Sequence, residues 1–215
     1  LDEVQIIDFA DPTALVNALT SGQVDVIADL PFAQVTTLEG NSDFTVLVSK
    51  AGSWLPITMA VDQAPFDDKR VRQAINYAID SNLIISRLVK DKAYRATSWL
   101  PPSAAAFDKT MKPYPYDPEK AKKLLAEAGY PNGFEVQLDC PNDRYVNDEA
   151  ICQATVGMLQ RIGVKVNLVT KSNTVLFGEY QKMETSFYML GWAPGSYDSW
   201  NVMQFIHKTV PTGPD

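Results

Sequence analysis

The sequence predicts an α/β fold in which a mixed β-sheet is flanked by helices, organised as one domain over residues 1–215. Two observations lead to this prediction. Short apolar runs of strand length alternate along the chain with longer segments whose apolar residues recur at helical spacing. Capping and stop signals stand at the ends of those helical segments. The expected strands after the first quarter of the chain are residues 57–61, 134–138, 164–169 and 186–190.

The first 48 residues predict a β-α-β unit followed by one more strand. Residues 4–7 and 24–28 are apolar runs expected to form strands, and residues 44–48 form another. Between the first two, Asp11 is a suitable N-cap and Pro12 suits the first helical turn. A strand-helix-strand unit of this length predicts a right-handed crossover within a sheet.

The remaining helices are predicted from amphipathic patterns. Residues 69–79 place Val71, Ala74 and Ile75 on one face, opposite charged residues. The other expected helices cover residues 82–89, 119–128, 147–162 and 175–182. Residues 93–118 are rich in proline and lack periodic apolar positions, so they are expected to form an extended, ordered loop.

Composition limits the possible functions. The chain has 215 residues, of which 46% are hydrophobic and 21% charged, as in ordinary globular proteins. The formal net charge of −7 and the lack of a Lys/Arg cluster argue against nucleic acid or an anionic membrane as partner. No apolar run approaches the roughly 20 residues of a membrane span. No signal-peptide pattern stands at the start, as expected for a segment cut from a longer protein.

Catalytic and metal sites are poorly supported by the sequence. His207 is the single histidine, with no carboxylate obviously poised to orient it, and the sequence has no Gly-rich phosphate or dinucleotide motif. Two cysteines and one histidine are too few for a usual zinc site, so no cofactor or metal is expected. The carboxylates of Asp67 and Asp68 are better explained as residues at a helix N-terminus.

The two cysteines are Cys140, at the end of an expected strand, and Cys152, within the following helix. A strand-loop-helix return can bring their Cα atoms within disulfide range, and we predict this bond. The alternative is a pair of buried thiols, because residue 152 can also face the core.

Several segments together resemble one family. Residues 65–80 are similar to the signature helix of the peptide/nickel (oligopeptide- and dipeptide-binding) family of extracytoplasmic solute-binding proteins of ABC importers. The family's other motifs are matched in order by residues 1–27, 116–130, 162–166 and 190–192. Each segment alone is a weak signal. Their common order across nearly the whole chain is specific.

The resemblance implies a lobe of the periplasmic-binding-protein-like class II type. Family members have two lobes that enclose a ligand, and this chain resembles the second lobe only, without the first lobe and the C-terminal return. The implied function is a periplasmic carrier that is not an enzyme and that delivers a small molecule or peptide to a membrane permease. The alternatives are a sensor or chaperone-like protein of the same fold, or an α/β hydrolase. The resembled family carries peptides, nickel chelates, opines, sugars and haem-like molecules.

The loop of residues 140–148 is the first candidate for ligand contact, because clefts of α/β proteins lie at strand ends. In dipeptide-binding relatives an arginine of this loop pairs with the ligand carboxylate, and Arg144 stands at that place. A guanidinium matches a carboxylate bidentately. Asn142 and Tyr145 are further candidates in the same loop. The alternative for Arg144 is a surface ion pair with Asp143 or Asp148.

The loop of residues 191–200 is the second candidate. In peptide-binding relatives an aspartate follows a Gly-Trp pair after two intervening residues, but Gly195 stands at that place in this chain, and Asp198 is the nearest acid. This departure argues against a free peptide N-terminus as the recognised group. Trp192 is expected to form the pocket floor, with a core position as the alternative. Tyr197 and Trp54 complete the expected ligand contacts.

Overall fold

The computed structural model describes residues 2–9, 11–30, 32–48, 52–104, 106–193, 195 and 198–204. The elements occur along the chain in the order α1 (Pro12–Thr20), α2 (Phe32–Glu39), β1 (Ile57–Met59), α3 (Lys69–Ala78), α4 (Ser81–Arg87), α5 (Pro118–Glu127), β2 (Glu135–Pro141), α6 (Asp148–Gln160), β3 (Lys165–Lys171), α7 (Asn173–Gln181), β4 (Phe187–Met189) and α8 (Ser199–Val202).

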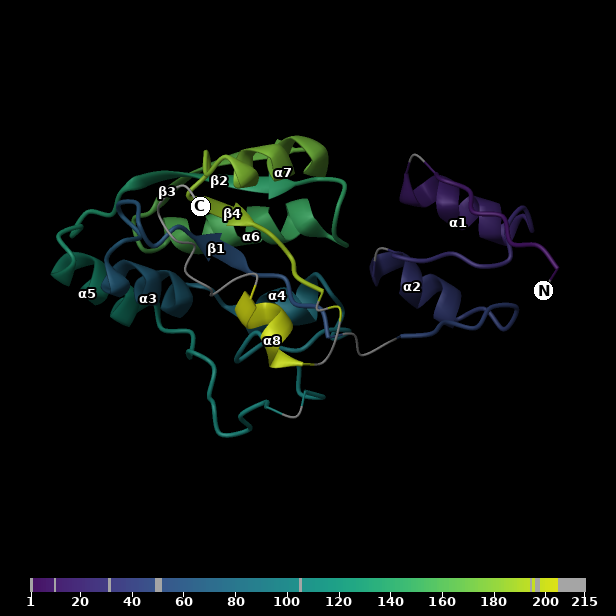
Figure 1. The fold of residues 1–215 in the computed structure, drawn as a ribbon, viewed down its shortest axis with the longest axis horizontal. Helices are drawn as coiled ribbons and strands as arrows, with labels where there is room; N and C mark the ends of the chain where they lie inside the picture. The colour runs from purple at the N-terminus through teal and green to yellow at the C-terminus, as the bar shows by residue number, and fades with distance from the viewer. Residues whose placement is uncertain are drawn as a thin grey trace.

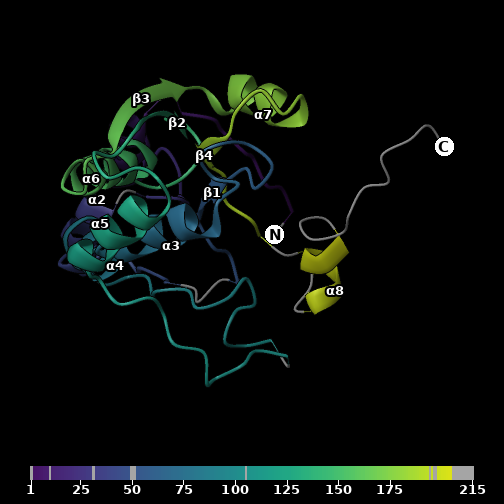
Figure 2. The same ribbon diagram turned by 90° about the vertical axis from the view of Figure 1, so that its left-hand side faces the viewer.

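The sheet has four strands in the order β1-β4-β2-β3. β2 runs parallel to both β3 and β4, whereas β1 is antiparallel to β4, so the sheet is mixed. Helices lie on both of its faces (Figures 1 and 2). The predicted fold class, a mixed sheet flanked by helices, is confirmed.

The alternation of β2 side chains assigns the helices to the two faces. Cys140 is joined to Cys152 of α6 by a disulfide, with the Cα atoms 6.6 Å apart. Its neighbour Asp139 points to the opposite face, where Lys171 connects its carboxylate to Glu179 of α7. α6 therefore covers one face of the sheet and α7 the other, and the predicted disulfide is confirmed.

The hydrophobic core lies on the α6 face. Phe66 and Phe187 are fully buried there, with ring centroids 5.0 Å apart. α3 adds the apolar face predicted from its sequence pattern, and Leu125 of α5 packs against it. Asp68 and Asp117 cap the N-termini of α3 and α5 through backbone amides, as their sequence positions suggest.

Residues 2–48 do not take part in this core. We call the sheet with the helices packed on it, residues 52–193, the sheet body. Figure 1 shows α1 and α2 to one side of it. The hydrophobic cluster at its core contains no residue before Ile57. An ion pair between Lys92 and Glu39, with Nζ and Oε1 2.5 Å apart, connects the two parts. α1 begins at Pro12 with Asp11 as its cap, as predicted.

The strands predicted at residues 4–7, 24–28 and 44–48 are wrong for this structure, and with them the β-α-β crossover. The described residues of these segments form no strand and belong to no sheet. The physical reason is that an extended segment becomes a strand only when a neighbour accepts its backbone hydrogen bonds. Ile6, Val26 and Leu47 are 91%, 83% and 89% exposed, so apolar surface that suits a sheet is left uncovered.

Candidate ligand-binding site

The backbone segments that carry Trp54 and Trp192 lie side by side at one end of the sheet. They form an antiparallel bridge in which each residue donates its amide to the other's carbonyl, at 3.0 and 2.9 Å. Trp54 and Trp192 were both predicted as ligand contacts, and the structure places them next to each other although 138 positions separate them (192 − 54). This bridge continues the pairing of β1 with β4.

Tyr145 connects the 142–147 loop to this bridge. Its hydroxyl accepts a hydrogen bond from the Gly191 amide at 2.8 Å. A Cβ atom on Gly191 would lie only 2.7 Å from Tyr145 Cε1, so the close approach requires glycine at this position. Tyr145 thus has a positioning role, because it holds the loop against the backbone that leads into Trp192.

Two aspartates fix the backbone of the 142–147 loop. The buried carboxylate of Asp148 accepts from the amides of Arg144 and Tyr145 at 3.1 and 3.0 Å. The Asp143 carboxylate accepts from the Asn173 amide at 2.7 Å, which attaches the loop to the start of α7. The loop is therefore held from within and from a neighbouring helix.

A third attachment comes from Asn147, which has a left-handed backbone with φ of 61°, a conformation that asparagine tolerates. Its side-chain amide donates to the Leu88 carbonyl at 2.6 Å. The disulfide of Cys140 with Cys152 lies just beyond the loop and ties β2 to α6. The loop is thus anchored at both of its ends.

Arg144 projects from this anchored loop into solvent. Its guanidinium carbon lies 5.5 Å from the centre of the Tyr145 ring. Among the described residues it forms no ion pair, because Asp143 and Asp148 serve backbone amides instead. The alternative of an ion pair with those residues is therefore not observed. Asn142 is exposed beside Arg144, and its backbone amide donates to the Lys171 carbonyl.

A polar network supports β4 from the α7 face. The Tyr180 hydroxyl donates to the Met189 carbonyl at 2.9 Å, and its ring stacks on Tyr188. Burial raises the pKa of the Tyr180 hydroxyl, so this donor stays protonated across the physiological range. The hydrogen bond with Glu179 raises the pKa of Lys171, which also meets the buried Asp139. These contacts hold the strand that precedes Gly191.

The predicted residues of the last loop are only partly described. Asp198 caps α8 by accepting from the Trp200 amide at 2.7 Å, which is a structural use of its carboxylate. Gly195 is described, whereas Tyr197 and His207 lie outside the described residues. The structure thus brings Trp54, Arg144, Tyr145 and Trp192 together, with Asn142 beside them, and uses Asp198 as a helix cap.

The sequence gives little indication that two further residues, Trp99 and Asp148, help to build this site. Trp99, in the proline-rich loop, packs against Trp54 with ring centroids 6.1 Å apart and the ring planes tilted. Its only signal is an aromatic side chain in a segment without helical or strand periodicity. Asp148, predicted only as a possible partner of Arg144, instead organises the loop backbone. Contacts of this kind depend on tertiary neighbours.

No helix in the described part of the chain is long and apolar enough to cross a membrane.

Comparison with known proteins gives one consistent result. The sequence profile of the bacterial extracellular solute-binding proteins, family 5 Middle, matches residues 1–213. The glutathione-binding protein GsiB of Shigella flexneri is 35% identical over 169 residues, and heme-binding protein A of Haemophilus influenzae is 32% identical over 210 residues. These matches cover 78% and 94% of this chain.

Solved structures agree on the fold. The periplasmic binding protein DppA from Helicobacter pylori, in complex with the peptide STSA, superposes with a TM-score of 0.81 at 25% identity over 91% of this chain. NikA from Brucella suis, in complex with Fe(III)-EDTA, has the same TM-score at 17% identity over 93% of this chain and shows the fold alone. The match covers 38% of the DppA chain and 43% of the NikA chain.

The chain spans about a third of the length of the curated relatives, 33% of GsiB and 38% of heme-binding protein A. The matched family profile covers nearly all of its residues, and the relatives and solved structures agree with it. The chain therefore belongs to the bacterial extracellular solute-binding proteins of family 5.

Proposed function

We propose that this chain is part of the substrate-binding component of a peptide-type ABC importer, and that it acts in the periplasm as a carrier and not as an enzyme. The observation that carries the proposal is the exposed Arg144, which forms no ion pair with any described residue, on a loop anchored beside the Trp54–Trp192 bridge. A guanidinium held in this way suits the capture of a ligand carboxylate. In the full protein the ligand is then delivered to a membrane permease.

We further propose that residues 52–193 form one lobe and that residues 2–48 belong to the other lobe of the complete protein. The sequence predicts one lobe over residues 1–215, and this proposal shortens that lobe to residues 52–193. Support comes from the core, which contains no residue before Ile57, and from the exposed apolar residues Ile6, Val26 and Leu47. Strands of the remaining protein would cover them.

The Trp54–Trp192 bridge suits a hinge between two such lobes. Two segments distant in the sequence leave the sheet body there as neighbours, joined by two hydrogen bonds. A hinge of a few residues at the ends of elements can absorb the backbone rotation that closes two lobes around a ligand. The anchored 142–147 loop would then face the ligand without a large rearrangement of its own.

The test is ligand binding by the complete two-lobed protein, measured by thermal shift and calorimetry. The panel contains glutathione, dipeptides, tetrapeptides, haem, opines and nickel chelates, which are chemically similar to the ligands named for the relatives. We expect at least one carboxylate ligand to bind to the complete protein and to bind on the order of 100-fold more weakly to residues 1–215, because one lobe buries much less of the ligand. Equal affinity for both proteins, or no binding across the panel, would contradict the proposal.

A further inference from the structure

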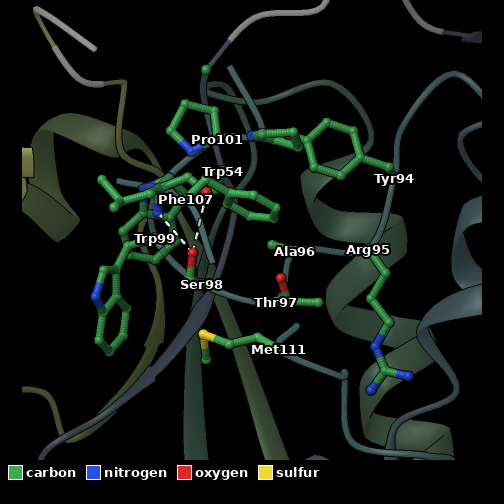
Figure 3. A pocket seen from close by; sticks show the side chains of 13 residues that line it. Trp54, Tyr94, Arg95, Ala96, Thr97, Ser98, Trp99, Pro101, Phe107 and Met111 are labelled. Atoms are coloured by element: carbon green, nitrogen blue, oxygen red, sulfur yellow. Dashed lines mark hydrogen bonds between the residues drawn. The ribbon is translucent and has the colours of Figure 1, made fainter. Parts of the chain in front are cut away.

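Residues 94–102 of the proline-rich segment, together with Phe107, Met111 and Trp54, line a partly open hollow of about 140 Å³. Figure 3 shows these side chains. The cavity opens beside the bridge that joins Trp54 to Trp192. The sequence predicts an extended, ordered loop for this segment. The lining of the hollow includes the side chains of Trp54, Tyr94, Thr97, Trp99, Phe107 and Met111.

The walls of this cavity are mainly aromatic and apolar. Trp54 and Trp99 meet with an interplanar angle of 49°, so their rings form two inclined walls. Among the described residues that line the hollow, Arg95 alone is charged, and Figure 3 shows its guanidinium directed away from Trp54. Aromatic walls without a nearby charge favour an apolar, flat group over a charged one.

The lining is more exposed than a core cluster of the same composition. Tyr94, Trp99 and Met111 are 49%, 41% and 46% exposed, although all three line the hollow. Apolar side chains gathered in a hollow and left partly open are typical of binding sites. The buried Nε1 of Trp54 and Oγ1 of Thr97 also have no hydrogen-bond partner among the described residues.

The volume limits the size of the occupant. A closed apolar cavity of about 150 Å³ is known to accept one benzene molecule. The hollow in this protein, at about 140 Å³, is of the same size. It has room for a single six-membered ring.

We propose that this hollow is a subsite that receives one aromatic ring of the bound ligand. The inference rests on the proposed function, because the subsite would lie at the edge of the ligand cleft, next to the hinge residues Trp54 and Trp192. The ring would pack in the hollow that Trp54, Trp99, Phe107 and Met111 line. The ligand class that it selects is a small molecule or peptide with a phenyl or phenol group.

The experiment uses p-cresol as the probe, with the complete two-lobed protein. Saturation-transfer NMR detects binding of the ring, and a titration gives its apparent affinity. Trp99→Ala removes one wall, and its matched control is Trp200→Ala, because Trp200 is 66% exposed on α8. Met111→Ala is a second, milder variant, with the exposed Met183→Ala as its control. Circular dichroism verifies that each variant is folded.

We expect saturable binding of p-cresol that weakens about fivefold or more in Trp99→Ala, on the scale of an aromatic contact, and stays unchanged in Trp200→Ala. Met111→Ala should weaken it by less, and Met183→Ala not at all. Failure of p-cresol to bind the native protein would overturn the inference, as would equal losses in a variant and its control. A segment of the other lobe that fills the hollow would give the first of these results.

Failure of this inference and failure of the proposed function have different signatures. If the panel contains a ligand but p-cresol does not bind, the carrier function stands and the aromatic subsite is refuted. If p-cresol binds in a Trp99-dependent way while no panel member binds, the subsite stands and the proposed importer function fails.

Discussion

Removal of the Cys140–Cys152 disulfide should destabilise the sheet body. Both cysteines are fully buried, and the bond closes a loop with a sequence separation of 12 between β2 and α6. In the chain-entropy description, a cross-link over a loop of this length stabilises the folded state by about 3 kcal/mol, because it restricts the unfolded chain. We therefore expect Cys140→Ala/Cys152→Ala to lower the free energy of unfolding by about 3 kcal/mol.

The measurement is urea unfolding of the complete protein, followed by a near-ultraviolet signal and by hydrogen exchange of β2 and α6 amides. Unfolding of the native protein in the presence of a reductant is the matched control, since it removes the cross-link but keeps both sulfur atoms in the core. If both samples lose about the same free energy, the cross-link is the cause. A loss of less than about 1 kcal/mol in both would refute the reasoning.

Three further predictions concern the site and its surroundings. Tyr145→Phe deletes the hydroxyl that accepts a hydrogen bond from the Gly191 backbone amide, and it should lower the free energy of unfolding by about 1–2 kcal/mol in the same urea assay. The control is Tyr130→Phe, because the Tyr130 hydroxyl has no hydrogen bond among the described residues. This variant should leave the free energy of unfolding almost unchanged. In the complete protein, Arg144→Ala should weaken binding of a carboxylate ligand by about 2–5 kcal/mol in calorimetry, with Arg161→Ala as the control; an unchanged affinity would assign Arg144 to the solvated surface. The hydrogen bond with Arg70 lowers the pKa of Asp68 from 3.8 to about 2, so its stabilising contribution is present above the unfolded value and is lost as the pH falls toward 2. Acid unfolding of Asp68→Asn should therefore show a smaller pH dependence between about pH 4 and 2 than that of the native protein; identical curves would contradict this.

The sequence by itself determined most of the sheet body. Helical periodicity and caps located α3 and α5 within one or two residues of their observed bounds, because these signals are local: Asp68 and Asp117 bond amides three positions away or fewer. The disulfide could also be predicted from the sequence, because a strand followed by a loop and a helix returns Cys152 to Cys140. Neither result needs knowledge of distant neighbours.

Pairing and long-range contacts required the tertiary structure. Residues 4–7, 24–28 and 44–48 have the apolar pattern of strands, but a strand also needs a partner, and none of the described strands pairs with them. The role of Tyr145 depends on Gly191, 46 positions away, and Trp54 meets both Trp99 and Trp192. The pattern of a single segment cannot specify such contacts, because the energy of each one depends on two segments that meet only after the chain has folded.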